Sequence, residues 1–146
     1  MVEEYRKAIA LDFDGVLHSY TSGWQGIGVV ADDPVPGSIG WLVGICLYSP
    51  YDVIITSCRC NEPAGIRAME DWIYDEVRKY IEDTAYVGME DPDQEKADDH
   101  EQVCATVKYA VQKPPTAFIF IDDRGWNFSG TFPSLTELDN FKPWNK

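Results

Sequence analysis

The sequence is poor in basic side chains, with 12 Lys and Arg against 25 Asp and Glu and a net charge of −13. Proteins that bind nucleic acid usually present a basic face that neutralises phosphate groups. No run of basic residues occurs anywhere in this chain. The composition therefore argues against a nucleic-acid partner, although it does not exclude one.

Long hydrophobic runs are also absent. No apolar stretch approaches the roughly 18 residues that a membrane-spanning helix requires. The charged residues Glu3, Glu4, Arg6 and Lys7 come directly before the first apolar run, so we expect no signal peptide. With 146 residues, 45% of them hydrophobic, the chain suits one globular domain over residues 1–146. We expect a cytoplasmic protein with no membrane partner.

Residues that bind transition metals are few and scattered: four cysteines and two histidines. Cys58 and Cys60 form a C-x-C pair, but structural zinc sites normally use two such clusters. We therefore expect reduced thiols that line a strand end or pack locally, and no zinc.

The most informative feature of the chain is an acidic pair that follows a short apolar run. Residues 8–11 have the character of a buried strand, and Asp12 and Asp14 follow them, with Gly15 allowing a sharp turn. Placing two anions together is costly unless a cation or a proton holds them. The pattern indicates a metal site or acid–base chemistry, although Asp and Gly also form ordinary solvated turns.

Two further apolar runs end in polar clusters. Residues 51–55 lead into Thr56 and Ser57, and residues 116–121 lead into Asp122 and Asp123. The carboxyl ends of parallel strands meet at one edge of a sheet, where ligands bind. The sequence thus predicts an α/β fold with a mostly parallel central sheet and a site at that edge.

These residues resemble the haloacid dehalogenase (HAD) superfamily, specifically its phosphatase-type members. Four motifs are matched in the family's order: Asp12, Asp14 and Gly15; then Ser57 or Thr56; then Lys113 or Lys108; then Asp122 and Asp123. The resemblance covers nearly the whole chain. It implies a three-layer, Rossmann-like HAD fold, and the spacing after the first motif leaves room for a minimal cap or none.

The resemblance also implies an activity, the Mg²⁺-dependent hydrolysis of a phosphate monoester. Asp12 would attack phosphorus and form an aspartyl-phosphate, with Asp14 as general acid and base. Mg²⁺ would be held by Asp12, the backbone carbonyl of Asp14, and Asp122, with Asp123 assisting. The substrate would be a phosphorylated small molecule or an exposed terminal phosphate.

Several roles stay open at this point. Ser57 would donate a hydrogen bond to the phosphoryl group, with Thr56 as the alternative. Lys113 would supply positive charge, because it precedes the final motif strand. Lys108 remains possible if residues 103–111 are helical. Two arginines that adjoin the motifs either clamp the substrate phosphate or pair with the acids: Arg59 and Arg124.

Other functions must be weighed against the phosphatase. A catalytically silent module that keeps the fold to bind phosphate or a partner is the alternative, and the intact Asp12 and Asp14 argue against it. A response-regulator receiver would carry its acid pair after the first strand and its phosphoacceptor Asp after the third. Here the doublet of Asp122 and Asp123 instead ends a strand near the C-terminus. Dehalogenase activity is disfavoured because Asp14 is the acid typical of phosphotransfer.

The rest of the chain predicts alternating helices and loops. Residues 15–36 are rich in Gly and Pro and should form a flap-like loop. We expect helices from Gly37 to Leu47, from Asn61 onward with Pro63 in the first turn, and from Ser134 to Asn140. The acidic stretch at residues 88–101 should be a solvated loop, and residues 103–111 a strand.

Overall fold

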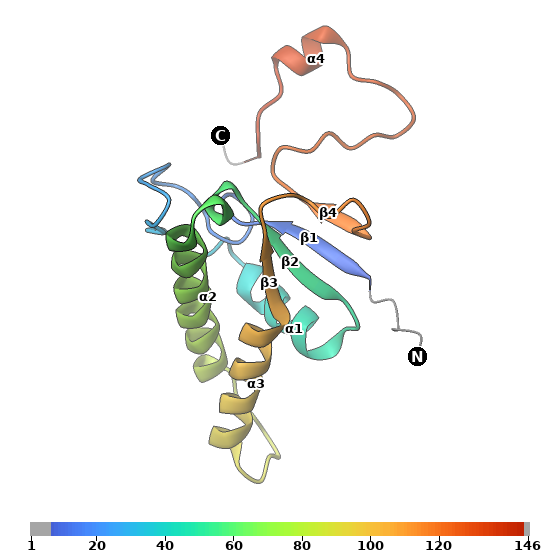
Figure 1. Cartoon of the computed structure of the whole chain (residues 1–146). Coiled ribbons are helices and arrows are strands. Elements are labelled where there is room, and N and C mark those ends of the chain that lie inside the picture. Colours follow the sequence, from blue (N-terminus) through green and yellow to red (C-terminus); the bar gives the residue numbers. More distant parts are fainter. Residues whose placement is uncertain (1–6, 145–146) are drawn as a thin grey trace, which may run out of the picture.

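The computed structural model of the chain describes residues 7–144, and four strands form its central sheet (Figure 1). The strand order is β3-β2-β1-β4, and every neighbouring pair is parallel. The strands are β1 (Ala8–Asp12), β2 (Asp52–Thr56), β3 (Val107–Ala110) and β4 (Ile119–Ile121). The predicted α/β fold with a parallel sheet is confirmed, and the arrangement is Rossmann-like.

Three long helices and two short ones connect and follow the strands. They are α1 (Ser38–Tyr48), the 3₁₀ turn η1 (Cys58–Asn61), α2 (Pro63–Asp83), α3 (Pro92–Thr106) and α4 (Leu135–Asp139). The predicted helices after Gly37, near Asn61 and after Ser134 are all present. Between residues 7 and 144, none of these helices combines the length and the apolar character needed to cross a membrane.

The acidic stretch at residues 88–101 is mostly helix, so the prediction of a solvated loop is wrong from Pro92 onward. The Asp91 side chain caps α3 by accepting a hydrogen bond of 3.1 Å from a backbone N–H of the first turn. Asp93 and Glu95 lie in that turn, where carboxylates interact favourably with the helix dipole. Acids at the start of this helix are therefore signals of a helix N-terminus and not of a loop.

The predicted strand at residues 103–111 begins later than expected. Residues 103–106 belong to α3, and Val103 is buried there in the core. Only Val107–Ala110 forms β3, paired in parallel with β2. Apolar content alone does not distinguish the end of a buried helix from the start of a strand.

The core lies between the sheet and helices α1, α2 and α3, which contact one another on the same face. It is built from alternate strand residues and the inner helix faces: Leu11, Val53, Ile55, Leu42, Met69, Ile73, Val77 and Val103. On the opposite face, Phe120, Ala10, Ile54 and Lys108 form a row in register, and the two outer members are exposed. Within residues 7–144, helices α1, α2 and α3 thus cover one face of the sheet. The helix layer on the other face, which the predicted three-layer fold requires, is not seen in these residues.

Between β1 and α1 the chain forms the predicted loop. Its only regular pairings among the described residues are isolated bridges of His18 with Asp14 and with Pro34. Gly15 has a φ of 86°, which an L side chain rarely adopts. Phe13 and Leu17 are fully buried, so the loop is anchored in the core at its start.

The chain after β3 packs differently from the rest. No residue between 111 and 144 is buried, and Figure 1 shows α4 and its flanking segments looping out beyond the sheet. Near the chain end, the indole N–H of Trp144 donates a hydrogen bond of 2.9 Å to the carbonyl of Gly15. The C-terminal segment therefore returns to the turn that follows the first acidic motif.

Candidate functional site

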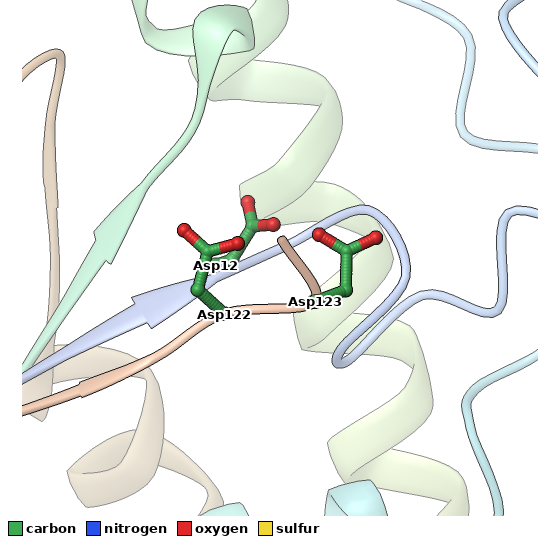
Figure 2. A group of neighbouring side chains, drawn as sticks. All are labelled: Asp12, Asp122 and Asp123. Carbon is green, nitrogen blue, oxygen red and sulfur yellow. The ribbon is translucent and has the colours of Figure 1, made fainter. Parts of the chain in front are cut away.

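Three carboxylates meet at the carboxyl edge of the sheet, from neighbouring strands (Figure 2). Leu11 of β1 is in register with Ile121 of β4, so the residues that follow along the two strands, Asp12 and Asp122, lie beside each other. One carboxylate oxygen from each of Asp12, Asp122 and Asp123 lies within 4.8 Å of the others, and all three side chains are partly buried. The predicted grouping of these acids is present in the structure.

Crowding changes the ionisation of Asp12. Burial is the largest cause that raises its pKa to about 7, and the neighbouring Asp123 and Asp122 raise it further. A hydrogen bond of 2.9 Å from the Phe13 backbone N–H opposes the shift. The charged form of Asp12 is therefore disfavoured, and a nearby cation would stabilise it.

Asp122 is in a different environment. Burial alone would raise its pKa, but the Lys113 ammonium and the backbone N–H of Arg124, which donates at 2.8 Å, hold the pKa below its usual value. Asp122 is therefore ready to act as an anionic ligand.

The cluster fits a hard divalent cation. Carboxylate oxygens are the ligands that Mg²⁺ and Ca²⁺ prefer, and Mg²⁺ commonly binds through only one or two carboxylates while keeping several waters. Asp12, Asp122 and Asp123 supply oxygens at suitable mutual distances. The Asp14 side chain is not part of this group, because it is bonded to Arg59 and His18. Only its backbone carbonyl is left for the metal ligation that the resemblance implies.

The two candidate lysines are in different parts of the sheet. Lys113 forms an ion pair with Asp122, and its ammonium lies 5.8 Å from the centre of the Phe120 ring. Lys108 is exposed on β3, which is separated from β4 by both β2 and β1. The geometry favours Lys113 as the cation of the site.

Asp14 is held by two side chains. The Arg59 guanidinium donates to both its oxygens, at 2.8 Å from Nε and 3.2 Å from Nη2, and the His18 Nδ1 lies 2.8 Å from Oδ1. Burial would raise the pKa of Asp14, but the hydrogen bonds from His18 and Arg59 and the charge of Arg59 outweigh it and lower the pKa. These contacts thus favour the carboxylate form of Asp14.

His18 is a buried part of the same network, which the sequence did not indicate. The Asp32 backbone N–H donates to its Nε2 at 3.0 Å, so that nitrogen is the acceptor and Nδ1 carries the proton given to Asp14. The ring also stacks on Phe13, with 5.6 Å between centroids. The contact with Asp14 spans only four residues, whereas the contact with Asp32 spans 14 residues and depends on how the loop folds.

Two roles were open for Arg59, clamping the substrate phosphate or pairing with an acid, and its contacts are those of an acid pair. Its side chain is 0% exposed, and besides Asp14 it donates to the carbonyls of Gly26 and Ile27 at 3.1 and 2.9 Å. Five N–H groups are the whole donor capacity of a guanidinium, and these bonds occupy most of it. The contacts therefore do not favour the predicted clamp on substrate.

The strand-end hydroxyls differ in their surroundings. Ser57 and Thr56 are both buried, at 8% and 5% exposure. Ser57 Oγ accepts a hydrogen bond of 3.2 Å from the Arg59 backbone N–H, and Ser57 lines the cleft over the carboxylates. The Thr56 hydroxyl has no hydrogen-bond partner within residues 7–144, and Thr56 is not among the residues that line the cleft. The geometry therefore favours Ser57 over Thr56 as the hydroxyl of the site.

A cleft of about 260 Å³ opens over the carboxylates. The residues that line it come from the first two strand ends, the loop after β1 and the end of β4: Asp12, Asp14, Tyr20, Trp24, Ser57, Cys58, Asp122, Asp123 and Arg124. Arg124 is thus placed where it can contact a ligand, as predicted for one of its two roles. Cys58 lines the strand end and Cys60 is buried in the core, which matches the expectation of local packing.

Residues of the first, second and fourth motifs line this cleft, and Lys113 of the third motif pairs with Asp122 beside it. The chain matches no protein-family model, no curated protein and no solved structure.

Proposed function

We propose that the protein is a Mg²⁺-dependent phosphomonoester hydrolase of the HAD phosphatase type, with a minimal cap or none. The observation that carries the proposal is the meeting of Asp12, Asp122 and Asp123 in one cleft, with Ser57 and Lys113 beside them. Hydrolysis of a phosphate monoester is very slow without a catalyst, so charge neutralisation and alignment are what a site must supply.

Asp12 is the nucleophile. One of its carboxylate oxygens attacks phosphorus, the bond from phosphorus to the leaving oxygen breaks, and the leaving oxygen departs with its electron pair. Water then attacks the aspartyl-phosphate, which releases inorganic phosphate and restores the carboxylate. Splitting one difficult displacement into two easier ones is the general advantage of covalent catalysis.

Asp14 handles the protons in this proposal, giving one to the leaving oxygen and taking one from water. The carboxylate form that Arg59 and His18 favour supports the second step more strongly than the first. General acid–base help of this kind typically contributes about 10²–10⁴ in rate.

Lys113 and Arg124 bring positive charge to the phosphoryl oxygens, and Ser57 donates a hydrogen bond to one of them. Asp12, Asp122 and Asp123 would hold Mg²⁺, which neutralises charge on the phosphoryl group and on the acids. The ion pair of Lys113 with Asp122 supports this placement, because it sets the ammonium beside the proposed cation ligands.

The decisive experiment compares the parent with Asp12→Asn on a panel of phosphomonoesters, with Mg²⁺ and with EDTA. A carboxamide is a far poorer nucleophile and cannot serve as an anionic ligand, so we expect activity to fall to background. Turnover of any substrate by Asp12→Asn at the parental rate would rule out the covalent mechanism.

The two lysines give a second test. Removing the Lys113 charge should lower kcat by an amount comparable with losing one oxyanion donor, about 10²–10³-fold. Met retains most of the aliphatic stem, so Lys113→Met and Lys108→Met form a matched pair. Steady-state kinetics on both variants should show the loss in Lys113→Met alone. The reverse pattern would move the third motif to Lys108.

A phosphate-binding module without catalysis is the second candidate, and one observation favours it. The pKa of Asp14 is lowered by Arg59 and His18, and a proton donor is most effective when its pKa lies near the operating pH. Calorimetry with inorganic phosphate separates the two candidates. Phosphate binding with no turnover of any monoester in Mg²⁺ would favour the module.

A further inference from the structure

Two aromatic side chains from the loop after β1 form part of the cleft wall. Tyr20 and Trp24 line the same cleft as Asp12 and the acids that follow β4. The Trp24 side chain is 50% exposed, so part of its ring is open to a ligand in the cleft. The lining of the cleft therefore combines aromatic side chains with charged ones.

Trp24 is fixed from behind by Arg59. The guanidinium carbon lies 4.8 Å from the centre of the indole ring, a cation–π distance. Since the guanidinium is fully buried and bonded to Asp14, Gly26 and Ile27, it holds the loop and the ring together. One indole face is thus occupied by Arg59, and the exposed part of the ring is presented at the cleft.

The loop is closely packed on both sides of Trp24, at Ile27 and at Tyr20. A Cβ on Gly65 would lie 2.0 Å from the Arg59 carbonyl oxygen and 2.9 Å from the Ile27 side chain, so the start of α2 packs directly against them. Tyr20 adopts a φ of 60°, and its ring meets the His18 ring edge-on at 6.2 Å between centroids. These contacts preorganise the aromatic wall before any ligand binds.

We propose that the cleft selects phosphomonoesters whose leaving group carries a flat aromatic ring, which stacks on Trp24. The proposal deepens the phosphatase assignment and rests on it for the reaction, while the ring contact can be tested without turnover. A volume of about 260 Å³ lies below the range of about 300–1,000 Å³ for sites of drug-sized ligands, so a small monoester fits better than a polymer.

A flat ring beside a phosphate has two common sources, the base of a mononucleotide and the phenol ring of phosphotyrosine. Each has a partner of the same kind without an aromatic ring. Adenosine 5′-monophosphate is compared with ribose 5-phosphate, and phosphotyrosine with phosphoserine. Each pair changes the ring while keeping the phosphate monoester, and the two pairs distinguish the two sources.

The experiment measures kcat/KM for the four compounds with Mg²⁺, and calorimetric binding of the same compounds to Asp12→Asn. At least one ring compound should exceed its ringless partner about tenfold, which corresponds to about 1.4 kcal/mol. This value lies within the range typical of stacking a base on an aromatic side chain.

The variants assign the preference to one side chain. Trp24→Ala should abolish the preference, so that each ring compound falls to the level of its ringless partner in the same variant, and Trp24→Phe should restore part of it because a smaller aromatic face remains. Trp41→Ala is the matched control, since Trp41 is 37% exposed on α1 and does not line the cleft. It should behave as the parent.

The outcomes separate this proposal from the phosphatase assignment. Hydrolysis of all four compounds with no ring preference, or with a preference that Trp24→Ala keeps, overturns the ring proposal and leaves the phosphatase standing. If the parent hydrolyses none of them, the same titrations are made on the parent. Ring-dependent binding that Trp24→Ala abolishes then supports ring recognition while the phosphatase assignment fails.

Discussion

Residues 7–110 and residues 111–144 are packed in opposite ways. The first region contains every buried residue among those described, including all of the hydrophobic core. The second contains none, although it carries many large apolar side chains, among them Phe128, Phe132, Leu135 and Leu138. Local stability follows buried apolar contact, so the second region should open far more readily than the first.

The two regions also differ in charge. Residues 111–146 hold four acidic and four basic side chains, so the whole net charge of −13 resides in residues 1–110. The acidic surface is thus a property of the packed region. The apolar, electrically balanced segment is the part in which self-repulsion contributes least.

The candidate site spans both regions. Asp12, Asp14 and Ser57 belong to the packed region, whereas Lys113 and the Asp122–Asp123 pair belong to the exposed one. The pairing of β1 with β4 is what brings the two halves together. A site divided in this way couples ligand binding to the docking of the weaker half.

Two ion pairs sharpen the comparison, one in each region. Arg59 with Asp14 has side-chain exposures of 0% and 15%, whereas Lys113 with Asp122 has 45% and 16%. Breaking a buried pair by removing one partner typically costs about 3–5 kcal/mol, because it leaves an uncompensated charge. Arg59→Met should therefore lower the free energy of unfolding by about 3–5 kcal/mol, measured by urea denaturation.

Arg78 provides the matched control for Arg59. Its pairs with Asp75 and Glu82 lie on the surface of α2, and surface pairs are worth about 0–1 kcal/mol. Arg78→Met should therefore be nearly neutral. A cost for Arg59→Met as small as that of the control would mean that Asp14 does not need its partner.

The next largest effect should come from equal truncations in the two regions. Leu42 is 0% exposed in α1, and Leu138 is 54% exposed in α4. Leu42→Ala should cost about 3 kcal/mol from lost burial and the cavity left behind, and Leu138→Ala should stay within about 0.5 kcal/mol. Similar costs in urea denaturation would show that the C-terminal segment is packed as tightly as the core.

Much of the site was predictable from the sequence because strand ends carry it. Apolar runs that end in Asp12, Ser57 and Asp122 lead to one edge of a parallel sheet, whatever the exact register. The Lys113 position followed from its place before the last strand. These features are local, and local patterns survive without knowledge of tertiary contacts.

What could not be predicted depends on contacts distant in sequence. The direction of the Arg59 side chain is set by the loop carbonyls of Gly26 and Ile27, which lie more than 30 residues away. The buried role of His18 depends in the same way on Asp32. The prediction of a loop at the acidic start of α3 failed for another reason. The same residue types favour both a solvated loop and a helix N-terminus.

A third prediction concerns the joint between the regions. Since Asp12 lies in one region and Asp122 and Asp123 in the other, cation binding should hold β4 against β1. At a Mg²⁺ concentration of 100 times the dissociation constant, linkage adds about 2.7 kcal/mol. Amide hydrogen exchange at Ile119–Ile121 should therefore slow, and the free energy of local opening that it measures should rise by up to that amount.

Core amides supply the internal reference for this exchange experiment. Those of Val53 and Ile55 in β2 are already buried, so Mg²⁺ should change their local opening much less. An Asp122→Ala variant should lose the protection of β4 along with affinity for the ion. Equal slowing in all four strands would indicate that the cation does not bind between the ends of β1 and β4.

The smallest effect on stability should come from the second ion pair. Lys113→Met breaks a contact in which the ammonium is nearly half exposed, and exposed pairs are worth about 0–1 kcal/mol. We therefore expect the urea midpoint to move little, although the same variant should lose most of its turnover if Lys113 serves the phosphoryl group. A destabilisation comparable with that of Arg59→Met would show that Lys113 anchors β4 to the sheet. The kinetic loss would then reflect misplacement of Asp122 and Asp123 and not the missing charge.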